Sequence, residues 1–181
     1  MQHAGWRTRG YLPHCDAAET VQHVIFRLAD ALPAKALAEL TRAPNAVRLD
    51  VAETTLDRGV GSCALRDPRV AGLVQDALRH FDGRRYQLFG WCVMPTHVHV
   101  LITQSEGWPL ASVVHAWKSF TAHRANDALG RSGRFWAPEY FDRLMRDDRQ
   151  AEAARAYIEY NPVAAGLCAR QEDWLWSSAS A

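Results

Sequence analysis

The part of the chain that decides the fold is the stretch Trp91-Cys-Val-Met-Pro-Thr-His-Val-His-Val-Leu-Ile102. It joins two runs, 85–93 and 97–104, that are rich in β-branched and aromatic residues and are typical of strands. Only residues 94–96 lie between the runs, too few for the crossover that parallel strands need. The stretch therefore predicts an antiparallel hairpin.

Outward from this hairpin, the same signals predict an α+β domain. A buried strand is expected over 20–28 and a strand or extended segment over 134–145, with helices over 33–42, 67–81, 109–128 and from 147 to about 161. The last helix is expected to end there because Pro162 disfavours the helical conformation in the residue before it. The signals in 44–63 are mixed, and we assign no element to that segment.

The 181 residues are expected to form one domain, with tails over 1–19 and 168–181. No apolar run approaches the roughly 18 residues of a membrane span, and the N-terminus lacks the apolar region of a secretion signal. The four cysteines form no C-x-x-C pair, which argues against a zinc knuckle or a dense disulfide framework. These features favour a cytoplasmic protein.

His97 and His99 are the first candidate site residues. They lie two apart on a predicted strand, so both side chains leave the same face, about 6.6 Å apart along the backbone. Two imidazoles at that spacing can bind one divalent ion and leave coordination positions open. On this spacing alone, two ordinary core or surface histidines remain an alternative.

The last predicted helix supplies the second pair of candidates, Tyr157 and Asn161. At 100° per residue the two positions lie about 40° apart on the helix, whereas Tyr160 lies about 60° to the other side of Tyr157. A phenol nucleophile and an amide ligand would then be presented together. The alternative is an amphipathic core tyrosine and a residue at the helix C-terminus.

The formal charge of +1 conceals a basic stretch. Residues 112–146 hold six Lys or Arg and three Asp or Glu, interleaved with aromatic residues. That mixture suits phosphate contact and base stacking. The candidate DNA-binding residues are Arg7, Arg9, Lys118, Arg124, Arg134 and Arg143. For Lys118, a phosphate contact, an activating role and a solvated helix position all remain open.

Further motifs are spread along nearly the whole chain. They are Gly10-Tyr-Leu-Pro-His-Cys-Asp16, Val21-Gln-His-Val-Ile-Phe-Arg-Leu-Ala-Asp-Ala-Leu-Pro33, Trp117-Lys-Ser-Phe-Thr-Ala-His-Arg124, Gly133-Arg-Phe-Trp136, Glu139-Tyr-Phe-Asp-Arg143, Tyr157-Ile-Glu-Tyr-Asn-Pro-Val-Ala-Ala-Gly-Leu167 and Trp174-Leu-Trp-Ser-Ser-Ala179. With the His97–His99 strand, they resemble the REP-associated tyrosine transposases, a branch of the single-tyrosine HUH transposases. Departures are Cys15 and Tyr160, where an aromatic and a polar residue are common, and the poorly matched 44–63 segment.

The resemblance implies a ferredoxin-like fold with a central antiparallel sheet flanked by helices. It implies that His97, His99 and Asn161 hold Mg²⁺ or Mn²⁺, and that Tyr157 attacks single-stranded DNA at REP hairpins. The product would be a 5′-phosphotyrosine and a free 3′-hydroxyl, a step that can be reversed to join strands. The resemblance further suggests a monomer associated with the nucleoid, with a homodimer left open.

Two other functions are alternatives. One is a REP-hairpin-binding protein with the same fold and no catalysis. The other is a nucleotide hydrolase of the histidine-triad kind, which needs a third alternating histidine where this chain has Leu101.

Overall fold

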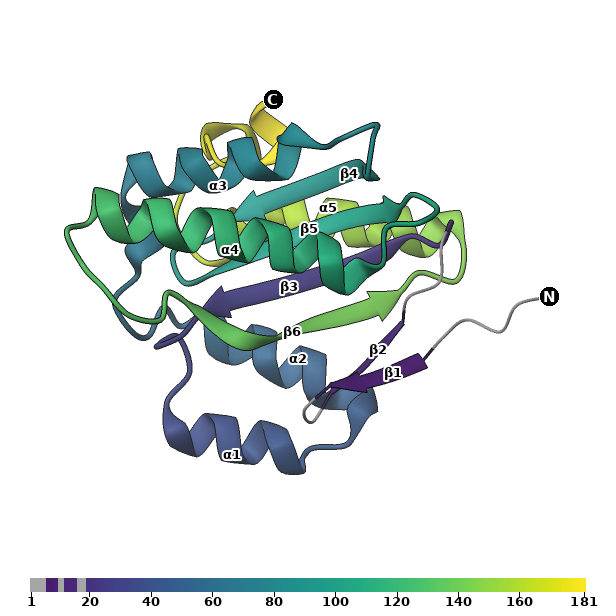
Figure 1. Ribbon diagram of the computed structural model, residues 1–181, viewed down its shortest axis with the longest axis horizontal. Coiled ribbons are helices and arrows are strands. Elements are labelled where there is room, and N and C mark those ends of the chain that lie inside the picture. The colour runs from purple at the N-terminus through teal and green to yellow at the C-terminus, as the bar shows by residue number, and fades with distance from the viewer. Residues whose placement is uncertain (1–5, 10–11, 16–18) are drawn as a thin grey trace.

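The centre of the computed structural model, which describes residues 6–9, 12–15 and 19–181, is a four-stranded antiparallel sheet (Figure 1). The strands lie in the order β4-β5-β3-β6. Their bounds are β3 Gln22–Leu28, β4 Tyr86–Val93, β5 His97–Gln104 and β6 Trp136–Leu144. The predicted hairpin is confirmed: Val93 pairs with Val98, and the Met94 N–H donates to the His97 carbonyl at 2.9 Å.

Helices cover both faces of this sheet. α3 (Pro68–His80) and α4 (Leu110–Ala128) lie on one face, and α5 (Asp148–Ala164) lies on the other (Figure 1). The order β3-α3-β4-β5-α4-β6, with both crossover helices on one face, is the ferredoxin-like arrangement. The expected α+β fold is therefore confirmed. No helix in the described part of the chain has the length and apolarity needed to cross a membrane.

Buried aromatic residues fill the space between the sheet and the α3–α4 layer. The Phe26 ring stacks on Trp117 with centroids 6.1 Å apart. The Trp117 indole N–H donates to the Tyr86 hydroxyl at 2.9 Å, and that hydroxyl donates to the Leu78 carbonyl at 2.7 Å. Because successive strand residues face opposite sides, the face that carries Phe26 and Val98 is not the face that carries His97 and His99.

Two elements differ from the expectations. Segment 44–63, left unassigned, contains α2 (Asn45–Leu56), which follows α1 (Ala34–Arg42). The last helix was expected to end near Asn161, which was wrong, because it continues through Pro162 to Ala164. Asn161 and Pro162 are both buried, and the Ala165 N–H reaches the Asn161 carbonyl at 2.9 Å. Packing of this turn outweighs the local preference of the residue before proline.

The two expected tails also contain structure. In the first 19 residues, β1 (Trp6–Arg9) pairs antiparallel with β2 (Leu12–Cys15). At the other end, η2 (Gln171–Asp173) and η3 (Ser178–Ser180) flank a segment that lies along β4. The Val93 N–H donates to the Trp176 carbonyl at 2.8 Å, and the Trp174 indole donates to the Val93 carbonyl at 3.0 Å. Such short pieces have no periodicity that sequence could reveal, and the unpaired edge of β4 supplies their partners.

Tyr86→Phe should lower the free energy of unfolding by about 1–3 kcal/mol, because it leaves the buried Trp117 indole N–H without its acceptor. Urea unfolding monitored by circular dichroism measures the change. Tyr160→Phe is the matched control, since that side chain is exposed. Equal stabilities of the two variants would contradict the structural role assigned to the Tyr86 hydroxyl.

Candidate active site

Two histidine rings meet on the face of the sheet that α5 covers. His97 and His99 are both fully buried, and their Nε2 atoms lie 2.9 Å apart. Burial lowers the pKa of His97 to about 3 and the pKa of His99 well below its usual range, since desolvation disfavours the charged ring. Both rings are therefore neutral near pH 7, the form that binds metal ions. The expected common face is confirmed.

The Thr96 hydroxyl determines which nitrogen of His97 carries the hydrogen. This hydroxyl donates to the Leu56 carbonyl at 3.1 Å, so its oxygen is left to accept from His97 Nδ1, 3.0 Å away. A neutral imidazole has a single N–H. His97 Nε2 therefore keeps its lone pair, directed toward His99.

A third histidine, His23 on β3, orients His99. Its Nε2 lies 3.0 Å from His99 Nδ1, and a hydrogen on His99 Nδ1 donated to His23 leaves His99 Nε2 with a lone pair as well. Burial, with a smaller effect from Arg143, lowers the pKa of His23 to about 3. The sequence interpretation used His23 only as part of a strand. The missed signal was a polar residue inside a buried strand.

α5 brings Tyr157 and Asn161 to the same place. Asn161 is only 2% exposed, and its Nδ2 lies 3.1 Å from His99 Nε2. Tyr157 is 41% exposed, and the centroid of its ring lies 5.9 Å from that of His99. Tyr160 is 55% exposed. The helical spacing argument therefore selected the two residues that reach the histidines.

Two carboxylates also lie at this site: Glu53 on α2 and Asp57 directly after α2. The sequence analysis missed both. Glu53 hydrogen-bonds with Tyr157, and burial raises the pKa of Glu53 to about 7, against the opposing effect of Arg143. Asp57 Oδ1 lies 3.5 Å from His97 Nε2, and burial raises the Asp57 pKa to about 6. Burial and the two carboxylates raise the pKa of the Tyr157 phenol above its ordinary value.

The donors fit a divalent ion. Adjacent ligands bound at about 2.1 Å around an octahedral ion lie about 3 Å apart, close to the distance between the His97 and His99 Nε2 atoms. Among the described residues, the buried Asn161 Oδ1 has no hydrogen-bond partner. Because rotation exchanges the two ends of an amide, this oxygen can take the position beside His99. The three side chains expected to bind metal are thus brought together.

The model of the family described as "Transposase IS200 like" matches residues 68–161, about half of the chain. The chain belongs to the IS200-like transposase family. Within the matched range lie both β5 histidines, Tyr157 and Asn161, whereas His23, Glu53 and Asp57 lie outside it.

This IS200-like chain is also similar to individual proteins. A Haemophilus influenzae protein described as a candidate REP-associated tyrosine transposase is 27% identical over 97 residues, which are 48% of this chain and 55% of that protein. The chain thus matches about half the length of this relative. A solved REP-associated tyrosine transposase bound to a REP hairpin shares the fold, with a TM-score of 0.56 and 18% identity over 95% of this chain and 81% of that one. A candidate transposase of Deinococcus radiodurans gives a TM-score of 0.41 and 19% identity over 86% and 96% of the two chains.

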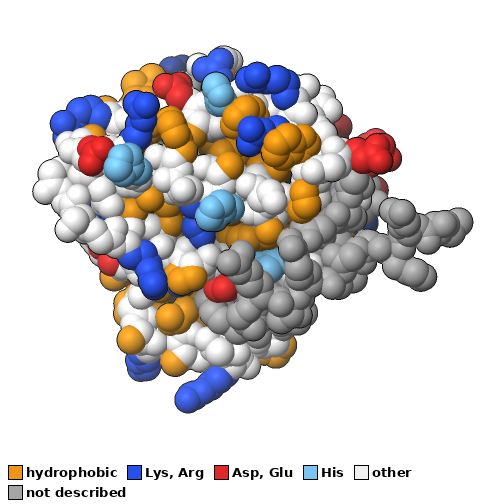
Figure 2. Space-filling model, in the orientation of Figure 1, with side chains coloured by type: hydrophobic (Ala, Val, Ile, Leu, Met, Phe, Trp, Pro, Cys, Tyr) orange, Lys and Arg blue, Asp and Glu red, His pale blue; other side chains and the backbone are white. Residues whose placement is uncertain are grey.

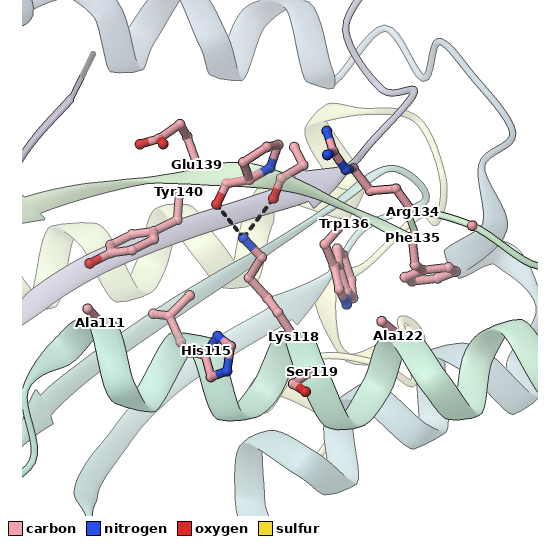
Figure 3. Close-up of a pocket in the computed structure, with 14 residues that line it drawn as sticks. Ala111, His115, Lys118, Ser119, Ala122, Arg134, Phe135, Trp136, Glu139 and Tyr140 are labelled. Carbon is pink, nitrogen blue, oxygen red and sulfur yellow. Dashed lines mark hydrogen bonds between the residues drawn. The ribbon is translucent and has the colours of Figure 1, made fainter. Parts of the chain in front are cut away.

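The cations expected to bind DNA in this IS200-like chain lie on two faces. Arg143, on β6, lies near the histidines and pairs with Asp50 at 2.8 Å. Lys118 and Arg134 line a cavity of about 420 Å³ between α4 and β6, on the opposite face (Figure 3). The Lys118 amine donates to the Ala137 and Pro138 carbonyls at 2.7 and 2.8 Å. Lys118 thus holds α4 to β6, away from the active-site histidines.

The α3–α4 surface, formed by these helices and the neighbouring segments 81–85 and 105–109, carries arginines stacked on aromatic rings. Arg124 lies over Phe120, with 5.1 Å from its guanidinium carbon to the ring centroid. Arg85 lies over both Phe81 and Trp108, at 3.4 and 4.2 Å. On this face, Lys or Arg side chains lie among hydrophobic ones (Figure 2). Arg7 and Arg9 are on β1, and their side chains fall outside what the structure describes.

Glu53→Gln tests the electrostatics of the site through pH. The raised pKa means that the Glu53 proton stabilises the folded state fully below pH 4.5, an effect lost as the pH rises through about 7. Glutamine cannot ionise. The stability of the variant relative to the wild-type protein should therefore increase, on the order of 1 kcal/mol, from about pH 5 to about pH 8.5.

Urea unfolding at the two pH values measures this difference, with the exposed Glu39→Gln on α1 as control for loss of one charge. A Glu53→Gln effect that does not change with pH would show that Glu53 does not hold its proton in the folded protein.

Proposed function

We propose that the protein is a REP-associated tyrosine transposase that cuts and rejoins single-stranded DNA at REP-type hairpins. The observation that carries the proposal is the convergence of His97 Nε2, His99 Nε2 and the Asn161 amide beside Tyr157. The family match and the relatives named for this activity support it.

In the proposed reaction Tyr157 is the nucleophile. Its phenol oxygen forms a bond to the phosphorus of the scissile phosphodiester, and the bond to the 3′ oxygen breaks. The 5′ phosphate is then carried on Tyr157, and the 3′ oxygen leaves as a hydroxyl after taking up a proton. Attack of a 3′-hydroxyl on the phosphotyrosine reverses the step and joins strands, because the ester is retained.

His97, His99 and Asn161 would hold Mg²⁺ or Mn²⁺ against the phosphate. A divalent ion there neutralises the charge of the phosphodiester and orients an in-line displacement. Thr96 and His23 fix the two imidazoles so that their Nε2 lone pairs converge. The Asn161 amide and Tyr157 lie on the same face of α5, so the helix holds the nucleophile beside the metal ligands.

Glu53 is placed to receive the phenol proton. Its carboxylate hydrogen-bonds with Tyr157, and its pKa of about 7 lets it exchange a proton near neutral pH. The partly exposed Tyr157 faces the side from which DNA can approach. Arg143 on β6 would contact phosphates on that side, while the arginine and aromatic side chains of the α3–α4 surface suit stacking of unpaired bases.

Tyr157→Phe should abolish both cleavage of a single-stranded REP oligonucleotide and the covalent protein–DNA adduct, because the nucleophilic oxygen is removed. The assay uses the hairpin of the host genome with Mn²⁺ and detects the adduct on denaturing gels. Tyr160 lies three residues further along α5 and is exposed, so Tyr160→Phe should keep both the cleavage and the adduct. An adduct that persists in Tyr157→Phe would overturn the assignment.

His97→Ala and His99→Ala should abolish cleavage while leaving the Kd for the hairpin within about threefold, since all phosphate and base contacts other than the one at the scissile phosphate lie elsewhere. Binding is measured by fluorescence anisotropy and cleavage on the same preparations. Equal loss of both would indicate a structural role for the histidines. Intact binding with no cleavage by the wild-type protein under any divalent ion would favour the alternative of a hairpin-binding protein without catalysis.

A further inference from the structure

The donor set of the proposed function leaves the choice of ion unexplained. Two imidazoles with one amide oxygen suit Zn²⁺ and other transition metals at least as well as Mg²⁺, which prefers oxygen ligands. A further oxygen ligand from the protein would shift the preference of the site from Zn²⁺ toward Mg²⁺ and Mn²⁺. The structure places such a carboxylate, that of Asp57, beside His97.

Asp57 follows the last residue of α2, and the start of β5 fixes its position. The Thr96 hydroxyl, which sets the hydrogen position of His97, donates to the carbonyl of Leu56, the neighbour of Asp57 in the chain. One side chain therefore orients the imidazole and anchors the end of α2 beside it. Asp57 Oδ1 lies 3.5 Å from His97 Nε2, and its side chain is 32% exposed, so it reaches the site from its open side.

The facing atoms are both acceptors. His97 Nε2 presents a lone pair, because the ring hydrogen is on Nδ1, and Asp57 Oδ1 is directed toward it. His99 Nε2 adds a second lone pair at the same point, and rotation of the Asn161 amide would bring its unpartnered oxygen there in place of the Nδ2 atom now 3.1 Å from His99 Nε2. Ligand atoms of Asp57, His97 and His99 all lie within 4.8 Å of one another. Acceptors that converge in this way repel one another unless a cation lies between them.

We infer that Asp57 is a fourth protein ligand of the metal site, which with His97, His99 and Asn161 forms a set of two nitrogens and two oxygens suited to Mn²⁺ or Mg²⁺. The inference rests on the proposed function, which supplies the other three ligands. The remaining positions of an octahedral ion would be left to water and a phosphate oxygen.

Glu53 does not offer the same role. Its cluster with His23 and His99 also lies within 4.8 Å, but it uses the Nδ1 side of His99. That nitrogen must donate its hydrogen to His23 whenever Nε2 is a ligand. The Glu53 carboxylate is hydrogen-bonded with Tyr157. One ion beside Asp57, rather than two ions sharing His99, is the arrangement that satisfies all these side chains.

The test is Mn²⁺ binding to the full chain without DNA, after treatment with a chelator, measured by titration calorimetry and by the electron paramagnetic resonance signal of free Mn²⁺. Asp57→Asn keeps the shape of the side chain and should raise the Kd for Mn²⁺ at least about tenfold. Asp50→Asn, on α2 and paired with Arg143, is the matched control and should change the Kd less than about twofold. Urea unfolding confirms that each variant is folded.

His97→Ala separates the inference from the proposal on which it rests. Loss of Mn²⁺ binding in His97→Ala together with a wild-type Kd in Asp57→Asn would overturn the role of Asp57 and leave the metal site in place. Wild-type binding in His97→Ala, or no binding by the unmodified protein, would overturn the metal site and the Asp57 inference together. A Kd for Mn²⁺ raised at least about tenfold in Asp57→Asn and His97→Ala, but not in Asp50→Asn, supports both the metal site and the role of Asp57.

Discussion

The pairing of β3 with β5 at the centre of the sheet is the constraint on which the site depends. In this register Ile25 lies opposite His99 and Arg27 lies opposite His97, so the β3 residues His23, Ile25 and Arg27 share a face with both histidines. A shift of one residue would move His23 to the α3–α4 side. Without the hydrogen bond between His23 Nε2 and His99 Nδ1, the hydrogen of His99 could reside on either nitrogen, and the lone pair at His99 Nε2 would no longer be fixed.

Local periodicity was enough to find part of the site. Two residues on a strand share a face, and four residues on a helix nearly complete one turn, so His97 with His99 and Tyr157 with Asn161 could be selected before any fold was known. The hairpin and the α+β class followed from equally local signals. A histidine inside a buried strand marks His23 as unusual, but its partner follows only from the β3–β5 register, which joins residues 76 positions apart.

Other misses have the same physical origin. α2 carries Glu53 next to the site, yet its sequence has no clear apolar stripe, so nothing local distinguished it from a loop. Pro162 sits in a helix because the turn around it is buried, and Lys118 bonds to β6 carbonyls because α4 packs on the face away from Tyr157. Tertiary packing decided each case. The order of the charges along the chain could not show on which side of the sheet they would lie.

The segment along β4 has a consequence for assembly. β4 is an edge strand of the central sheet, and edge strands invite pairing with another chain. Here Val93 and Cys92 already pair with Trp176 and Ser177, while the Ser178 hydroxyl accepts from the Trp91 N–H at 3.1 Å. Continuation of the sheet into a second copy across this part of β4 would first require residues 174–178 to detach, which exposes two tryptophans.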